Sequence, residues 1–226
     1  MPIHLTFDLL AAVAALALTY AVWRRRLRDQ PLTQVQNGYV AALSLGILLG
    51  SYGLGTANLW LSGLPGLGRS ILGALAGGIA AVEVWKARHG ITGSTGLIFV
   101  PTFATLVIIG RIGCALSGLE DQTHGIPTAL PWGQDHGDGI PRHPVALYES
   151  LAMAGFLLWA LVALGRRSPL ILSRGFYLMV GFYALQRFGW EFLKPYAPVL
   201  GPMNLCHIAC IGVFCYAVVM MRGPAR

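Results

Sequence analysis

Long hydrophobic runs, separated by short polar or basic segments, dominate this chain of 226 residues. Seven of the runs approach the roughly 20 residues that an α-helix needs to cross the hydrocarbon core of a bilayer. They predict spans over residues 5–23, 39–57, 70–85, 97–116, 143–164, 174–193 and 204–221. The pattern therefore predicts an all-α membrane protein with about seven transmembrane helices.

The composition agrees with this fold class. Hydrophobic residues make up 55% of the chain and charged residues only 11%, and the mean hydropathy is +0.63. No Ser/Pro-rich linker, low-complexity tract or long-period repeat marks a separate soluble domain. We therefore expect one polytopic transmembrane domain over residues 1–226. The first run has its basic residues after it instead of before it, which predicts a retained span and not a cleaved signal peptide.

Basic residues gather in every second connection between the predicted spans. They are Arg24, Arg25, Arg26, Arg28, Lys86, Arg88, Arg166, Arg167, Arg174, Arg222 and Arg226. Because basic residues near span ends stay on the cytoplasmic side, the N-terminus is predicted outside and the C-terminus inside. This bias accounts for most of the net charge of +7, so the charge does not indicate a nucleic-acid partner.

Five basic residues remain that the topology does not explain, and all are predicted on the outer side or in the outer half of a span. They are Arg69, Arg111, Arg142, Arg187 and Lys194. A cation at such a position needs an anionic partner. The candidate partners are an internal carboxylate and a lipid phosphate.

Polar residues of three predicted spans are expected at one level of the outer half. Tyr183, Arg187 and Glu191 follow a four-residue spacing, which places them on one helical face. Arg111 is predicted at a similar depth, as is Glu149 of the neighbouring span. The grouping favours a polar cavity open to lipid headgroups, while the simpler alternative is a pair of internal struts, Arg187 with Glu191 and Arg111 with Glu149.

The segment 117–142 is rich in proline and glycine, which predicts an ordered outer loop without a regular helix, lying as a lid over the cavity. Asp135, His136, Asp138 and His143 lack a recognised metal-ligand spacing, so we expect no metal and no other cofactor. The four cysteines form no CxxC pair and lie in or beside apolar runs. Helix packing is favoured for them over disulfide or metal chemistry.

Three motifs together resemble the prolipoprotein diacylglyceryl transferase family. They are GRIGCALSG (110–118), PRHPVALYE (141–149) and YALQRFGWEFLKP (183–195). The resemblance implies a seven-span enzyme of the bacterial inner membrane with its site on the periplasmic side. It also implies the reaction, in which a diacylglyceryl group moves from phosphatidylglycerol to the cysteine thiol of a lipoprotein signal peptide and glycerol phosphate is released.

The resemblance also implies roles for individual residues. Arg111 and Arg187 bind the phosphate, Glu191 orients Arg187, and His143 is the candidate base. Further substrate contacts are implied for Arg142, Tyr148, Glu149, Tyr183, Lys194, Ser117 and Gly118. Cys114 and Ser117 stand where the family pattern has asparagines, so the chain resembles a divergent, compact member.

Two other functions are compatible with the same residues. A non-catalytic membrane protein that binds phospholipid and organises a partner would keep the phosphate site without the chemistry. A transporter would be indicated by paired, interrupted spans, which the sequence does not show. The expected partners are phosphatidylglycerol or another anionic phospholipid and a lipoprotein signal peptide; the sequence leaves the oligomeric state open.

Overall fold

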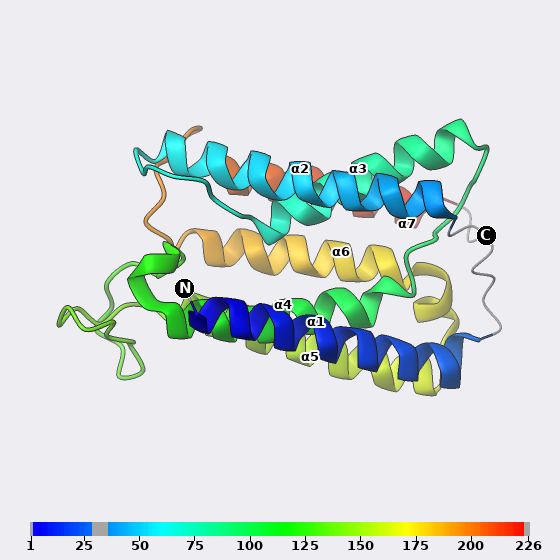
Figure 1. Ribbon diagram of the computed structural model, residues 1–226, viewed down its shortest axis with the longest axis horizontal. Coiled ribbons are helices and arrows are strands. Elements are labelled where there is room, and N and C mark those ends of the chain that lie inside the picture. Colours follow the sequence, from blue (N-terminus) through cyan, green and yellow to red (C-terminus); the bar gives the residue numbers. More distant parts are fainter. Residues whose placement is uncertain (1, 29–35, 224–226) are drawn as a thin grey trace. The chain divides into compact units, whose positions relative to one another are not determined.

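The computed structural model describes residues 2–28 and 36–223, and Arg226 of the topology argument lies outside them. Within these residues the chain forms seven α-helices and no β-strand (Figure 1). The helices are α1 (Pro2–Val22), α2 (Asn37–Leu61), α3 (Ile71–Arg88), α4 (Phe99–Ser117), α5 (Val145–Gly165), α6 (Pro169–Glu191) and α7 (Leu205–Arg222). A π-helical turn, η1 (Trp23–Leu27), continues α1, and a 3-10 turn, η2 (Gly118–Asp121), follows α4.

Each of the seven predicted spans corresponds to one helix, which confirms the all-helical class. Among the described residues, five segments are long and apolar enough to cross a membrane. They are Ile3–Leu27, Asn37–Leu61, Phe99–Ser117, Val145–Gly165 and Leu205–Arg222. The helices α3 and α6 carry more charged residues than the others and are not among these five segments. A membrane crossing by all seven helices therefore stays a prediction.

The chain divides into two compact units. The first comprises Met1–Arg28 and Gly96–Pro195, with α1, α4, α5 and α6; the second comprises Asp29–Thr95 and Tyr196–Arg226, with α2, α3 and α7. A single polytopic domain over residues 1–226 stays a prediction.

In the first unit, α1 lies along α4 and α4 lies along α5 (Figure 1). Gly113 allows the close contact of α1 with α4, because an added Cβ there would lie 2.6 Å from the Cβ of Phe7. Nearer the other end of α4, the hydroxyls of Thr19 and Thr102 form a hydrogen bond of 2.7 Å. This packing fixes the start of α1 beside the end of α4, where the GRIG motif lies.

In the second unit, glycines hold α2 and α3 in backbone contact. A Cβ added to Gly73 would lie 2.2 Å from the carbonyl oxygen of Gly50, and one added to Gly77 would lie 2.2 Å from that of Gly46. Gly73 and Gly77 form a GxxxG pair, and this spacing of small residues lets the two helices approach closely. 

The C-terminal end of α3 carries a local ion pair. Lys86 Nζ lies 2.9 Å from Glu83 Oε1, and the hydroxyl of Tyr216 on α7 donates to the same oxygen at 2.8 Å. The contact with Tyr216 was not predicted, and it ties α7 to α3 within the second unit.

Candidate functional site

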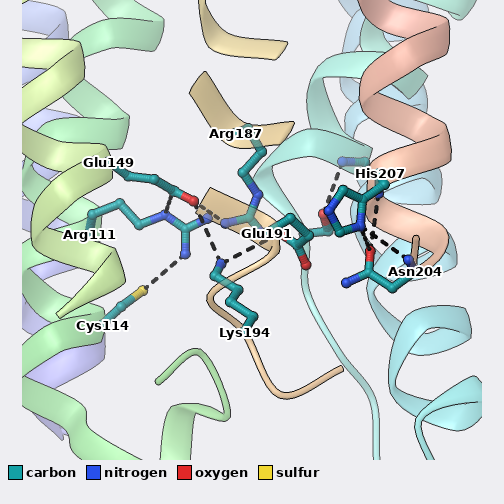
Figure 2. A network of polar contacts seen from close by, with 10 residues as sticks. Arg111, Cys114, Glu149, Arg187, Glu191, Lys194, Asn204 and His207 are labelled. Carbon is teal, nitrogen blue, oxygen red and sulfur yellow. Dashed lines mark hydrogen bonds and ion pairs between the residues drawn. The ribbon is translucent and has the colours of Figure 1, made fainter. Parts of the chain in front are cut away.

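A group of buried charged side chains gathers where α4, α5 and α6 of the first unit meet (Figure 2). Glu149 of α5 forms ion pairs with Arg111 of α4 and with Arg187 of α6. The second terminal nitrogen of Arg187 lies 2.8 Å from Glu191 Oε2, one turn farther along α6. One carboxylate thus joins the two pairs predicted as struts, and the result is a single cluster.

Lys194, just beyond α6, completes this charged cluster. Its Nζ lies 3.6 Å from Glu149 Oε1 and 3.9 Å from Glu191 Oε2. The segment that carries Lys194 is held in place because the N–H of Ile126 donates to the carbonyl of Leu193 at 2.8 Å. The outer loop therefore helps to position a cation of the site.

The charged cluster carries an excess of positive charge. Arg111, Arg187 and Lys194 contribute three cations, and Glu149 and Glu191 contribute two carboxylates, which leaves one net positive charge. Each of the five side chains belongs to a residue at most 5% exposed. Buried charges are costly unless they are paired, so an excess of positive charge at such a place favours an anion beside it. Guanidinium groups match the geometry of phosphate oxygens.

Tyr183 lies one turn before Arg187 on the same face of α6, as the four-residue spacing predicts. It is fully buried, and its ring packs edge-on against Phe103 of α4 at a centroid distance of 5.0 Å. Tyr183 therefore belongs to the packed wall between α4 and α6.

His143 and Tyr148 form a group of their own with Trp132 of the outer loop. The indole N–H of Trp132 donates to the Tyr148 hydroxyl at 2.8 Å, and His143 Nδ1 lies 3.5 Å from that hydroxyl. Within the described residues, no hydrogen bond or ion pair joins His143 to Arg111 or Arg187. The structure thus brings the two arginines together and leaves the predicted base outside their contacts.

A small pocket lies beside His143. Its lining comprises Cys114, Ala115, Gly118, Thr123, His124, Gln134, His136, His143, Pro144, Val145 and Ala146. Cys114 connects this pocket to the charged cluster, because its Sγ lies 3.9 Å from Nη1 of Arg111. Ser117 contributes little to the pocket, since its hydroxyl donates to the carbonyl of Gly113 at 2.9 Å.

His124 contributes a buried polar atom to the pocket. Its Nδ1 finds no hydrogen-bond partner among the described residues. Burial, together with the charge of Arg142 and the proximity of His136, lowers the pKa of His124 below its ordinary value. His124 thus adds a polar ring to the lining of the pocket.

Arg142 lies in the outer loop and is engaged there. Its two terminal nitrogens donate to both oxygens of Asp138, at 2.8 and 2.7 Å. These hydrogen bonds lower the pKa of Asp138 to about 2. Backbone hydrogen bonds between Gln134 and Arg142, of 2.8 and 3.0 Å, order the loop. Arg142 thus shapes the loop and has no ion pair with the carboxylates of the charged cluster.

One arrangement in the first unit was missed by reasoning from the sequence. His4 Nδ1 lies 3.0 Å from Asp8 Oδ2, and His4 Nε2 lies 3.7 Å from Cys114 Sγ. The sequence favoured helix packing for Cys114. One sequence signal could have indicated this arrangement: the four-residue spacing of His4 and Asp8 places both on one face of a helix.

Residues 5–222 match the family described as Prolipoprotein diacylglyceryl transferase, and the chain belongs to this family. Several curated relatives carry the fuller name phosphatidylglycerol–prolipoprotein diacylglyceryl transferase. A phosphatidylglycerol–prolipoprotein diacylglyceryl transferase of Nitratidesulfovibrio vulgaris is 31% identical over 172 residues, which cover 70% of this chain and 63% of the relative. The protein of that name from Geobacter sulfurreducens is 28% identical over an alignment that covers 81% of this chain and 69% of the relative's length. Phosphatidylglycerol–prolipoprotein diacylglyceryl transferase 2 of Streptomyces coelicolor is 33% identical over an alignment that covers 56% of this chain and 42% of the relative's length.

The alignments thus span between 42 and 69% of the length of these three relatives. No solved structure matches the chain. The name of the family describes a transferase, and five helices of the described residues are long and apolar enough to cross a membrane. 

Proposed function

We propose that this chain moves a diacylglyceryl group from phosphatidylglycerol to the thiol of a prolipoprotein cysteine or a related acceptor. The observation that carries the proposal is the charged cluster, in which three cations share two carboxylates in the apolar interior of the first unit. A phosphate diester would neutralise the excess charge. The relatives named above are transferases with this donor and this acceptor in their names.

Arg111 and Arg187 are the proposed phosphate ligands. A guanidinium has five N–H donors, so its pairing with Glu149 leaves donors for phosphate oxygens. Glu149 and Glu191 hold Arg187 in one orientation, and Lys194 adds a positive charge to the same site. The cations are thereby fixed before the donor arrives, which is the condition for strong electrostatic stabilisation of a leaving phosphate.

The proposed reaction is a displacement at the glycerol carbon. The bond between that carbon and the phosphate oxygen breaks, a carbon–sulfur bond forms, and glycerol phosphate leaves with its charge held by the arginines. His143 is the proposed base for the acceptor thiol, since it lines the pocket that Cys114 connects to the charged cluster. Gly118, which lines this pocket, and Tyr148, next to His143, are proposed to contact the substrates. Ser117 and Arg142 lie outside the lining, and a role for them in substrate binding stays a prediction.

We also propose the arrangement in the membrane. The positive-inside distribution supports seven spans in the bacterial inner membrane, with the N-terminus outside, the C-terminus cytoplasmic and the site toward the periplasm. Large apolar side chains on the outer helix faces, such as Leu16 and Leu151 at 68 and 72% exposure, suit contact with lipid. The ordered loop 117–142 acts as a lid.

The test is a transfer assay with the purified chain in vesicles of labelled phosphatidylglycerol and a peptide that carries a lipoprotein cysteine motif. We expect lipidated peptide and free glycerol phosphate by mass spectrometry. Arg187→Gln should reduce the rate at least about a hundredfold, because it removes a donor to the leaving phosphate. The matched control Arg166→Gln, an exposed arginine after α5, should leave the rate unchanged. Phosphatidylglycerol binding without product would overturn the catalytic proposal.

A further inference from the structure

Cys114, His4 and Asp8 form a chain of three polar contacts at the junction of α1 and α4. The sulfur of Cys114 lies 3.7 Å from Nε2 of His4, and Nδ1 of the same ring lies 3.0 Å from Oδ2 of Asp8. The histidine therefore faces the thiol with one nitrogen and the carboxylate with the other. In this orientation the carboxylate fixes the ring, and the nitrogen that faces the sulfur can accept its proton.

The fold produces this arrangement through helix packing. His4 and Asp8 lie one turn apart, and Phe7 lies between them on the same side of α1. Phe7 packs directly on Gly113, the residue before Cys114, and only a glycine leaves room for it. The contact turns His4 toward the sulfur across the helix interface.

The surroundings of the sulfur suit a reacting thiol. Arg111 Nη1 lies 3.9 Å from Sγ, so a positive charge lies beside the sulfur and stabilises its thiolate form (Figure 2). Cys114 also lines the pocket described above, which contains the unpartnered Nδ1 of His124. The sulfur therefore borders a pocket with polar side chains, and the cysteine itself is 8% exposed.

We propose that Cys114 is a nucleophile that takes an acyl group from a glycerolipid ester. His4 accepts the proton of the thiol, and the sulfur attacks the carbonyl carbon of the ester. The bond between that carbon and the glycerol oxygen then breaks, the proton passes from His4 to this oxygen, and a lysolipid leaves. The product on the protein is a thioester at Cys114, and no oxidant, reductant or further reactant is required.

The order of nucleophile, base and carboxylate favours acyl transfer. In acyl-transfer enzymes on unrelated folds, a histidine held by a carboxylate activates a thiol or hydroxyl nucleophile through the same order of contacts. Ester carbonyls are the electrophiles that every diacyl glycerolipid presents at the depth of its headgroup. This activity goes beyond the proposed diacylglyceryl transfer, which breaks a bond to phosphate and leaves both esters intact.

The experiment uses the full chain in vesicles of phosphatidylglycerol with deuterated acyl chains. Intact-mass and peptide mass spectrometry should find one deuterated acyl group on Cys114, removed by neutral hydroxylamine as expected of a thioester. Cys114→Ser should lack the hydroxylamine-labile adduct, and His4→Gln and Asp8→Asn should slow its formation at least about tenfold. His89→Gln, a histidine stacked on Trp85 in the second unit, is the matched control and should not change it.

A second measurement guards against misfolded variants. Methanethiosulfonate labelling of Cys114 should slow by a similar factor in His4→Gln, while labelling of the exposed Cys215 should stay constant. An adduct that resists hydroxylamine, an acyl group that forms equally fast in His4→Gln, or no acyl group on Cys114 would each overturn the proposal. Transfer to the cysteine peptide, measured in the same samples, shows separately whether the proposed function stands.

Discussion

Arg187 of α6 donates to Glu149 of α5, and this buried ion pair lies at the centre of the charged cluster. Because Arg111 and Lys194 also face Glu149, this one carboxylate contacts all three cations of the cluster, and Glu191 supplies the second negative charge. Glu149 is fully buried, so none of this balance is supplied by water.

We therefore expect Glu149→Gln to destabilise the protein strongly. Removing one partner of a buried ion pair leaves an uncompensated charge and costs about 3–5 kcal/mol. The midpoint of denaturant unfolding, followed by the helical circular dichroism signal in detergent, measures this loss. Transfer of diacylglyceryl groups should fall as well, because Arg187 and Arg111 lose their common anchor.

The control for this prediction is Glu83→Gln in α3. Glu83 also pairs with a lysine, but its side chain is 33% exposed, so water replaces much of the lost interaction. Its cost should stay below that of Glu149→Gln, because one cation loses its carboxylate at Glu83 and three do at Glu149. Equal losses for the two variants would contradict a special role of Glu149.

The helices were predictable because each contains a hydrophobic run, and charges or turn residues interrupt the sequence between runs. The largest error at a boundary concerns α6, which begins at Pro169 and not near Arg174. Proline suits the first turn of a helix, where its missing N–H needs no partner, and the apolar residues after it continue the helix into the segment assigned to the connection. Hydropathy alone does not show whether the charged helices α3 and α6 cross the membrane.

The charged cluster was predictable in part. Spacing within α6 gave the shared face of Tyr183, Arg187 and Glu191, and depth placed Arg111 near them. Depth does not give the rotation of a helix about its axis, so the separation of His143 from the arginines was not foreseen. The contact between His4 and Cys114 depends on how Phe7 packs on Gly113, and side-chain packing across distant segments leaves no periodic signal in the sequence.

A second prediction concerns the contact of α2 with α3. Gly50→Ala should destabilise the second unit, because the new Cβ would lie 2.1 Å from the carbonyl oxygen of Gly73. The helices must move apart, and such overpacking typically costs about 1–3 kcal/mol.

Gly53→Ala on the same helix is the control, since its Cβ meets no atom within 4 Å. There the substitution should be neutral or stabilising, because alanine favours a helix by about 1 kcal/mol over glycine. Thermal unfolding of the two variants side by side gives the comparison.

A third prediction concerns the pH dependence of the outer loop. The two hydrogen bonds from Arg142 lower the pKa of Asp138 from its ordinary 3.8 to about 2. A carboxylate with a lowered pKa stabilises the folded loop above its ordinary pKa, and this contribution disappears as the pH falls through the lowered value. The loop should therefore stay ordered at pH 3 and loosen near pH 2.

Hydrogen exchange of residues 134–142, followed by mass spectrometry, measures this loosening. In Asp138→Asn the amides should exchange at least about threefold faster than in the unsubstituted chain at pH 4, where the aspartate is still charged. The difference should shrink toward pH 2, because protonation then removes the same interaction from the unsubstituted chain. A difference that is independent of pH would show that the carboxylate charge does not hold the loop.

The last prediction joins packing to chemistry at Gly113. Gly113→Val should push α1 away from α4, because even a single added Cβ would lie 2.6 Å from the Cβ of Phe7. The distance between His4 and Cys114 depends on this contact, so labelling of Cys114 by methanethiosulfonate should lose its dependence on His4. In practice, Gly113→Val and the double variant with His4→Gln should be labelled at equal rates. Gly110→Ala, one turn earlier on α4, meets no atom within 4 Å and should keep the difference that His4 makes. If Gly113→Val also keeps it, α1 is held beside Cys114 by contacts other than the one between Phe7 and Gly113.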